Sequence, residues 1–319
     1  MTTANPISNV ACSVVIPTKN GGVHFSRSLA GLQQQTIWKS VELIVVDSGS
    51  TDGTLEAARS AGARVIDIPP EEFNHGATRD YGISVASGEV VVLMVQDAEP
   101  KESTLLEVIL RQFNNPEVAG VYARQIPQPD ADLLTKRNLN NWLTGRAEPE
   151  ARRMQSVDWY DTLSPIEKLH FCNFDNVCSA IRKSVWSQHR FGRINFGEDI
   201  DWAERVLRSG FVIVYEPAVA VIHSHDRPIT YEYKRTYVCH RKLYQQFGLH
   251  LVPTVSGIFK AWAHCTGRDI MFISSQDVPL RDKVSLWTKS PLLNFVSALA
   301  QYNAAKDESA GRSNSIRGV

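Results

Sequence analysis

The sequence concentrates three carboxylates within four positions, at Glu198, Asp199 and Asp201, and places Trp202 directly after them. A carboxylate in such a cluster can take a proton from a reacting hydroxyl, which is general-base chemistry. The structural alternative is that acids in the first turn of a helix complement the positive end of its dipole. Residues 203–210 have the composition of a short helix ended by glycine, so the cluster taken alone permits both interpretations.

Two further acids come directly after apolar runs. Asp47 ends the run 41–46 and opens a loop rich in serine and glycine, and Asp97 follows the apolar residues 89–95 and Gln96. An Asp in a loop commonly bonds its own backbone, which is the structural alternative for Asp47. An acid at the end of a central strand has no packing role. A hard cation carrying substrate phosphates is the natural ligand of Asp97.

Two histidines alternate after the apolar residues 218–222. His223 and His225 would project to the same face of an extended chain, and imidazole nitrogen is a plausible ligand for Mn²⁺. Each is an ordinary polar side chain when taken alone, and spacing does not choose between them. Arg227 and Tyr231 follow this pair.

Arg79 is a cation in the expected first turn of a helix, where the helix dipole disfavours positive charge. Residues 73–79 read Phe-Asn-His-Gly-Ala-Thr-Arg, with a turn at 74–76 and Arg79 in the first turn of a helix expected at 78–86. Because the positive end of the helix dipole disfavours a cation there, Arg79 indicates anion binding.

These residues need a scaffold, which the first half of the chain supplies. Apolar runs alternate with segments of helical spacing, which predicts an α/β fold with a mostly parallel, doubly wound sheet and helices on both faces. The expected strands are 12–17, 41–46, 63–68, 89–95 and 118–123, and the expected helices are 24–35, 54–61, 78–86 and 101–113. Ligands of such sheets bind at the carboxyl ends of the strands, where the loops from Pro17, Asp47 and Gln96 begin.

Composition and fingerprints exclude several functions. Neither of the first two loops contains GxGxxG or GxxxxGK[ST], which argues against a dinucleotide site and a P-loop. Lys and Arg number 34, as do Asp and Glu, so the chain lacks the basic excess of a nucleic-acid-binding protein. The five cysteines are widely spaced and odd in number, which favours reduced thiols. With no signal peptide and no long apolar stretch, we expect a cytoplasmic protein.

Together these segments resemble the family 2 glycosyltransferases, whose fold is called GT-A. The resemblance runs from about Ser13 to about Gly248 and is carried by the segments SVVIPTKN (13–20), VVDSGSTDGT (45–54), QDAEP (96–100) and GEDIDW (197–202). The run 73–79 together with Gln96, Asp97 and Ala98 is more particularly similar to the bacterial rhamnosyltransferases of that family.

The resemblance implies a role for each matching residue. Asp199 would be the catalytic base and Glu198 its partner, while Asp201 and Trp202 would meet the acceptor, with a core position as the equal alternative for Trp202. The residues expected around the nucleotide sugar are Pro17, Thr18, Asn20, Asp47, Ser48, Ser50, His75, Arg79, Gln96, Asp97, Arg227 and Tyr231. Thr18 and Asp47 would meet the base and ribose, with Pro17 shaping the base pocket.

A metal site is implied as well. Asp97 matches the second acid of the family's DxD motif, whereas Val95 stands at the first acid's position. A histidine, His223 or His225, would complete the site for Mn²⁺ or Mg²⁺.

The implied reaction is an inverting displacement at the anomeric carbon. The expected donor is dTDP-β-L-rhamnose, and the expected acceptor is a hydroxyl of a bacterial surface polysaccharide or lipid-linked glycan. A UDP-sugar of GlcNAc, Gal or Glc is the alternative donor. A nucleotidyltransferase is disfavoured by the short, weakly basic loop 18–22, and a non-catalytic nucleotide-sugar-binding protein by the intact Asp97, Asp199 and His225.

The sequence also predicts an organisation into segments. We expect a disordered leader over 1–10, a catalytic domain over 11–248 with its halves meeting near 125, a helical region over 249–302 and a disordered tail over 303–319. Apolar residues of the helical region would pack on the main domain, on a second copy in a homo-oligomer, or on the inner face of a membrane as a peripheral protein.

Overall fold

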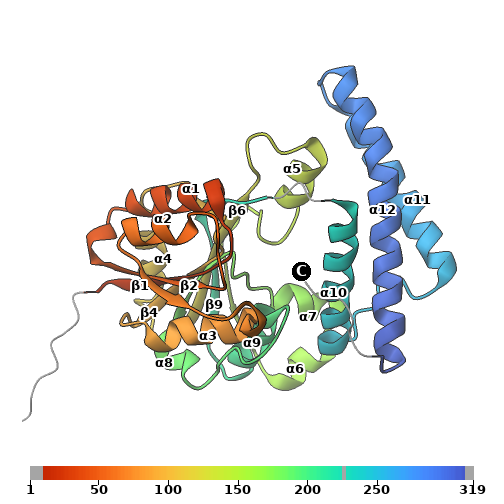
Figure 1. Cartoon of the computed structure of the whole chain (residues 1–319). Helices are drawn as coiled ribbons and strands as arrows, with labels where there is room; N and C mark the ends of the chain where they lie inside the picture. Colours follow the sequence, from red (N-terminus) through yellow and green to blue (C-terminus); the bar gives the residue numbers. More distant parts are fainter. Residues whose placement is uncertain (1–9, 225–227, 313–319) are drawn as a thin grey trace, which may run out of the picture. The chain divides into compact units, whose positions relative to one another are not determined.

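The computed structural model describes residues 10–224 and 228–312 of the 319-residue chain (Figure 1). Within these residues the chain forms two compact units. The first unit comprises residues 10–128, 139–162 and 170–224, and the second comprises residues 129–138, 163–169 and 228–312. The predicted leader, except for Val10, lies outside the described residues.

A mixed sheet forms the centre of the first unit. Its order over the described residues is β3-β2-β1-β4-β8-β6-β9-β5, with β7 paired to β9 off this path. The strands are β1 (Cys12–Thr18), β2 (Val41–Asp47), β3 (Arg64–Asp67), β4 (Val90–Met94), β5 (Glu99–Pro100), β6 (Val118–Ile126), β7 (Glu150–Arg153), β8 (Cys178–Arg182) and β9 (Val212–Ile222). Strands β1 to β4 are parallel, as are β6 and β9, while β8 runs antiparallel between β4 and β6.

Helices cover both faces of this sheet, so the predicted α/β fold is confirmed (Figure 1). One face carries α1 (Gly22–Gln33), α2 (Thr54–Ser60) and α4 (Leu105–Gln112), and the other carries α3 (His75–Val85), α8 (Lys183–Trp186) and α9 (Glu198–Arg208). The remaining helices of this part of the chain are η1 (Trp38–Ser40), η2 (Pro70–Glu72), α6 (Val157–Thr162) and α7 (Pro165–Phe171), of which α7 is divided between the units.

Alternation along β1 builds the two layers of the core. Val14 and Ile16 pack with Phe25 of α1 on one face. Val15 faces α3, where a Cβ added to Gly82 would lie 2.4 Å from its Cγ1. Gly82 therefore allows α3 to lie directly on the sheet.

Two boundaries in the first unit differ from prediction. The sequence predicts separate strands over 211–215 and 218–222, because Glu216 and Pro217 interrupt the apolar run. The structure has one strand, β9, which passes through Pro217. The register against β6 jumps between Ala123 and Arg124, and this bulge accommodates the proline without ending the pairing. Helix α3 begins at His75 rather than residue 78, because the Asn74 side chain caps it.

Three long helices form most of the second unit. They are α10 (Ile229–Phe247), α11 (Val255–Ser275) and α12 (Leu280–Ser309), with α10 and α11 packed on α12 (Figure 1). The start of α5 (Leu133–Asn140) joins them, since Leu134 packs with Ile273 and Leu286. The predicted C-terminal helical appendage is thus confirmed.

The limits of this appendage differ from prediction at both ends. Helix α10 belongs with the appendage rather than with the catalytic unit that we expected to end at residue 248. Residues 303–309, predicted to be disordered, are helical. The reason is lateral bonding to α10: Tyr237 donates to Asp307 at 3.0 Å, and Arg241 pairs with Glu308 at 2.7 Å. In the described part of the chain, no helix is both long and apolar enough to cross a membrane.

Candidate active site

The loops after β1 and β2 are joined through Asp47. Its carboxylate accepts hydrogen bonds from the hydroxyls of Thr18 at 2.8 Å and Ser50 at 2.5 Å. The backbone amides of Gly49 and Ser50 donate to its other oxygen at 3.0 and 2.8 Å. Asp47 is only 1% exposed, so in this structure it holds the loop together, as the structural alternative expected. To contact a nucleotide directly, the Asp47 carboxylate would have to replace one of these hydrogen bonds with a bond to the nucleotide.

Further bonds fix the same edge of the sheet. Asn20 adopts a left-handed conformation, with φ 49°, and its backbone amide donates to the Ser50 hydroxyl at 2.8 Å. The Gln96 side chain accepts from the Lys19 amide at 2.9 Å, and the Ser48 amide donates to the Thr18 carbonyl at 2.9 Å. The structure therefore gathers the predicted nucleotide-side residues Pro17, Thr18, Asn20, Asp47, Ser48, Ser50 and Gln96 in adjoining loops.

Asp97 and His223 lie beside each other. Asp97 follows β4 and precedes β5, and β5 pairs antiparallel with the end of β9, with Glu99 opposite Ile222. This pairing brings the Asp97 loop to His223, whose Nε2 is 3.6 Å from Asp97 Oδ1. Both side chains are partly open to solvent, at 23% and 14% exposure. A carboxylate oxygen and an imidazole nitrogen thus lie close together at the carboxyl edge of the sheet.

The acidic cluster forms the first turn of α9, after Gly197 in a left-handed conformation. Asp199 is half-buried, and the Asn176 amide donates to its Oδ2 at 3.4 Å. Burial, together with the carboxylates of Glu198 and Asp175, raises the pKa of Asp199 well above the ordinary 3.8. A carboxyl group with a raised pKa holds a proton more readily, which suits a general base.

Arg79 contacts the acidic helix directly. Its guanidinium lies 2.9 Å from Glu198 Oε1, and both side chains are about 5% exposed. Arg79 also donates to the His75 carbonyl at 3.1 Å, and Asn176 donates to Glu198 at 3.1 Å. Arg79 lies in the second turn of α3, one turn later than predicted, and in this structure its charge is paired with Glu198.

The segment 73–79 docks α3 against the chain that leads into α9. The Gly76 amide donates to the Ile194 carbonyl at 3.1 Å. A Cβ added to Gly76 would lie 2.2 Å from the Gly192 carbonyl oxygen, so only glycine permits this approach. Asp80 accepts from the amides of Phe191 at 3.0 Å and Gly192 at 2.8 Å. The motif therefore positions the acidic turn.

The structure contradicts the acceptor role given to Trp202. Its side chain is 0% exposed and packs against Phe174 and Phe191, with ring centroids 5.0 and 5.8 Å away. A fully enclosed ring has no face for a sugar, so the core alternative holds. Asp201, the other predicted acceptor residue, pairs with Arg205 one turn along α9 at 3.0 Å.

For three predicted residues the position relative to these loops is not described. His225 and Arg227 lie outside the described residues. Tyr231 is in the first turn of α10 and belongs to the second unit.

Three polar residues that support the site were not predicted from the sequence. Asp175 and Asn176 precede β8, and Gln125 lies near the end of β6 with a side chain 7% exposed. The available signal was the segment 173–176, in which three polar residues surround Phe174 directly before an apolar strand. Gln125 carries no such signal, because a single glutamine near a strand end is unremarkable in sequence.

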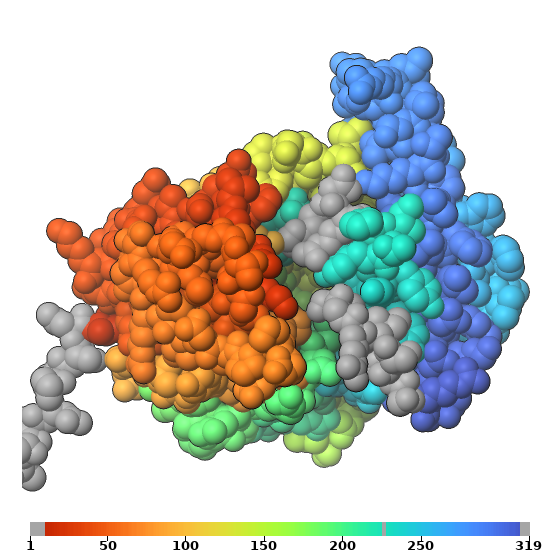
Figure 2. Space-filling model, viewed as in Figure 1, coloured from red at the N-terminus to blue at the C-terminus, as the bar shows by residue number. Residues whose placement is uncertain are grey.

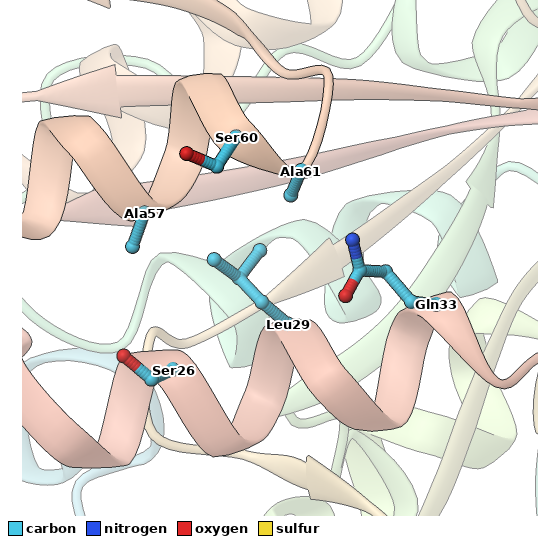
Figure 3. A pocket seen from close by; sticks show the side chains of 6 residues that line it. All are labelled: Ser26, Leu29, Gln33, Ala57, Ser60 and Ala61. Atoms are coloured by element: carbon cyan, nitrogen blue, oxygen red, sulfur yellow. The ribbon is translucent and has the colours of Figure 1, made fainter.

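A hollow of about 170 Å³ between α1 and α2 is not part of this site (Figure 3). Its lining residues are Ser26, Leu29, Gln33, Ala57, Ser60 and Ala61. These come from the sides of the two helices, away from the carboxyl edge of the sheet, and include no predicted site residue.

A mixed sheet with a serine-rich loop, an acid–histidine pair and an acidic helix at the carboxyl edge of its parallel strands defines a GT-A glycosyltransferase. The sequence profile of glycosyl transferase family 2 matches residues 13–189. The chain therefore belongs to glycosyl transferase family 2.

Two relatives are named as O-antigen chain rhamnosyltransferases. The chain is 29% identical over 309 residues to WbaN of Salmonella anatum, covering 92% of this chain and 89% of that one. It is 28% identical over 235 residues to RfbN of Salmonella typhimurium, covering 70% and 69% of the two chains.

Solved structures share the fold. The mannosyltransferase PcManGT of Pyrobaculum calidifontis, in complex with GDP-Man and Mn²⁺, has a TM-score of 0.61 at 16% identity, covering 95% of this chain and 88% of that one. TarS of S. aureus, in complex with UDP-GlcNAc, has a TM-score of 0.52 at 14% identity, covering 94% and 92%.

Proposed function

We propose that this glycosyltransferase moves L-rhamnose from dTDP-β-L-rhamnose to a hydroxyl of a bacterial surface polysaccharide or lipid-linked glycan, with inversion. The names of the two Salmonella relatives support the choice of sugar. The observation that carries the chemistry is the half-buried Asp199, whose pKa is raised by burial and by two neighbouring carboxylates.

Asp199 acts as the general base in one displacement. Its carboxylate takes the proton of the acceptor hydroxyl as the hydroxyl oxygen attacks the anomeric carbon. The bond between the anomeric carbon and the phosphate oxygen breaks, and the nucleoside diphosphate leaves with its electron pair. Glu198, neutralised by Arg79 at 2.9 Å, keeps α9 in place.

Asp97 and His223 are suited to hold a divalent metal. Two ligands that are each about 2.1 Å from one ion lie at most about 4.2 Å apart, and the 3.6 Å between these two atoms satisfies that limit. Among the described residues no group of three or more acids, histidines or cysteines converges on one point. Other positions on an ion would remain open to phosphate oxygens and water. A bound Mn²⁺ or Mg²⁺ would neutralise the leaving diphosphate.

A comparison of donors tests the sugar assignment. Initial rates would be measured with dTDP-rhamnose, UDP-rhamnose and UDP-glucose on one acceptor extract, preceded by a thermal-shift screen with and without Mn²⁺. We expect dTDP-rhamnose to be preferred, UDP-rhamnose to be used more slowly and UDP-glucose to be poor. A pocket made for the 6-methyl group rejects a hydroxyl by only about 10²-fold. Faster transfer from UDP-glucose, UDP-galactose or UDP-GlcNAc would overturn the rhamnose assignment and leave the family unchanged.

We also propose that α11 rests on an anionic membrane surface, near a lipid-linked acceptor. Its exposed apolar residues are Val255, Phe259, Ile270 and Met271, each at least 41% exposed. Lys260 and Arg268 are exposed on the same helix, and its one acid, Asp269, is buried against Arg137. Figure 2 shows α11 atoms, in light blue, at the surface on the side of α12 away from α10. Apolar and basic side chains without an exposed acid match an anionic lipid surface.

Vesicle flotation tests this surface. We expect the protein to bind vesicles of anionic phospholipid, and the double substitution Phe259→Ser and Lys260→Glu to reduce binding at least several-fold. A dimer in solution, lost in the same variant, together with no vesicle binding, would instead assign α11 to contacts between copies of the chain.

A further inference from the structure

The side-chain amide of Gln125 bridges the acid–histidine pair and the loop before β8. Its Oε1 is 3.0 Å from His223 Nδ1, and its Nε2 donates to Asp175 Oδ2. Gln125 is 7% exposed, so neither end of the amide is simply solvated. Gln125 is on β6 and pairs in register with Val221 of the parallel strand β9, two residues before His223.

The bridge has one consistent orientation. A carboxylate accepts hydrogen bonds and donates none, and the other Asp175 oxygen already accepts from the Val177 amide at 2.9 Å. The NH₂ group of Gln125 must therefore face Asp175, which leaves its carbonyl oxygen facing His223. Because a carbonyl oxygen only accepts, His223 Nδ1 must carry a hydrogen.

The protonated Nδ1 determines what the other ring nitrogen can do. In a neutral imidazole with Nδ1–H, the lone pair is on Nε2, and Nε2 is the atom 3.6 Å from Asp97 Oδ1. We propose that Gln125 is a positioning residue: held by Asp175, it fixes His223 in the Nδ1–H tautomer and aims the Nε2 lone pair at a divalent cation shared with Asp97. The cation rests on the proposed function, whereas the tautomer does not.

Asp175 links this bridge to the base. Its carboxylate holds the Gln125 amide and also raises the pKa of Asp199. One side chain therefore serves both the donor side of the site and the acceptor side, and Gln125 and Asp199 depend on the same carboxylate.

Nitrogen NMR on the full-length protein tests the tautomer without metal or donor. The protein would carry ¹⁵N-histidine, with the His223 signals assigned by their loss in His223→Gln. We expect the Nδ1–H form in the wild type and a mixture of tautomers in Gln125→Met, which keeps the side-chain length and removes both polar atoms. A wild-type His223 that is protonated on Nε2 alone would overturn the proposal.

Manganese binding provides the second readout, by electron paramagnetic resonance of Mn²⁺ with dTDP present. We expect Gln125→Met to weaken Mn²⁺ binding by about 10- to 100-fold, the usual effect of removing the partner of a metal-bound histidine. The matched control is Gln112→Met. The Gln112 side chain donates to Glu216 at 2.6 Å and does not contact His223, Asp175 or Asp97 in any bond described above. The Mn²⁺ affinity of this control variant should equal that of the wild type. Equal affinity in the two variants, with both folded by circular dichroism, would contradict the proposal. If the wild type binds no Mn²⁺, the metal assignment fails, and the tautomer still decides the role of Gln125.

Discussion

The guanidinium of Arg79 and the carboxylate of Glu198 lie 2.9 Å apart with both side chains about 5% exposed, which joins α3 to the first turn of α9. Glu198 also accepts from the Asn176 side chain at 3.1 Å. The residue next to Glu198 is Asp199, so the position of the proposed base depends on a buried ion pair contributed by a helix more than a hundred residues earlier in the sequence.

The first prediction concerns the contribution of this ion pair to stability. Replacing one partner of a buried pair leaves an uncompensated charge and costs about 3–5 kcal/mol, whereas replacing both with apolar residues costs much less. We expect Arg79→Met to lower the free energy of unfolding by that amount and the double variant Arg79→Met, Glu198→Met to recover part of it. Urea denaturation of the wild type and the three variants measures the cycle.

A surface pair provides the control for that cycle. Arg153 and Glu117 lie 2.8 Å apart, and both are more than half exposed, so Arg153→Met should cost less than about 1 kcal/mol. Additive losses from Arg79→Met and Glu198→Met would show that the two buried side chains do not stabilise each other.

The second prediction concerns the metal. Asp97→Ala should abolish Mn²⁺-dependent binding of dTDP-rhamnose, because a cation bridging to phosphate loses its carboxylate ligand. Asp161→Ala is the control, since Asp161 is an exposed acid that pairs with Arg208 at the end of α9. Isothermal titration with and without Mn²⁺ measures both variants. Transfer that is unchanged in EDTA would show that the reaction needs no metal.

The third prediction follows from the raised pKa of Asp199. A carboxyl group with a raised pKa in the folded state stabilises the fold while it is protonated. That contribution is complete below the ordinary pKa of 3.8 and is lost as the pH rises through the folded pKa. At pH 7, which is above the ordinary pKa, this carboxyl group therefore destabilises the fold relative to a neutral side chain, so Asp199→Asn should unfold at an equal or higher urea concentration than the wild type. A clearly lower midpoint at pH 7 would contradict this sign.

The fourth prediction concerns the pH dependence of turnover. The acidic limb of kcat/KM should follow the deprotonation of Asp199, because only the carboxylate accepts a proton. Asp175→Asn removes one carboxylate that raises this pKa, so the limb should move to lower pH when measured at saturating Mn²⁺. If the acidic limb stays in place or moves to higher pH, the group that titrates in this limb is not Asp199.

The sequence predicted the alternation of the longer strands and helices up to residue 123 and the loops at the carboxyl edge of the sheet, because each of these depends on local apolar periodicity and loop composition. The two-residue strand β5 and the short helices η1 and η2 were not predicted. The bulge in β9 was not predicted, since Pro217 ends a strand by local rules and only pairing with β6 accommodates it. The helical residues 303–309 were missed for a similar reason: their polar composition is compensated by bonds to Tyr237 and Arg241.

Residue types identified most of the candidate site residues. The contacts between these residues were not predicted, because the partners are distant in the sequence. Asp97 and His223 were identified separately, but their 3.6 Å separation follows from the β5–β9 pairing. Arg79 was expected to meet an anion on a ligand, and the structure gives it Glu198 instead. For Trp202 the acceptor role and the core position were equal alternatives, although its spacing of four residues from Val206 favours the buried face of α9.

Single-turnover kinetics of Asp199→Asn with dTDP-rhamnose shows whether Asp199 removes the acceptor proton. Asparagine keeps the shape of the side chain but cannot accept the proton, so turnover should fall by about 10²–10⁴-fold, while the affinity for dTDP-rhamnose and Mn²⁺ stays within about twofold of the wild type. Turnover close to that of the wild type, with donor binding intact, would show that another group is the base.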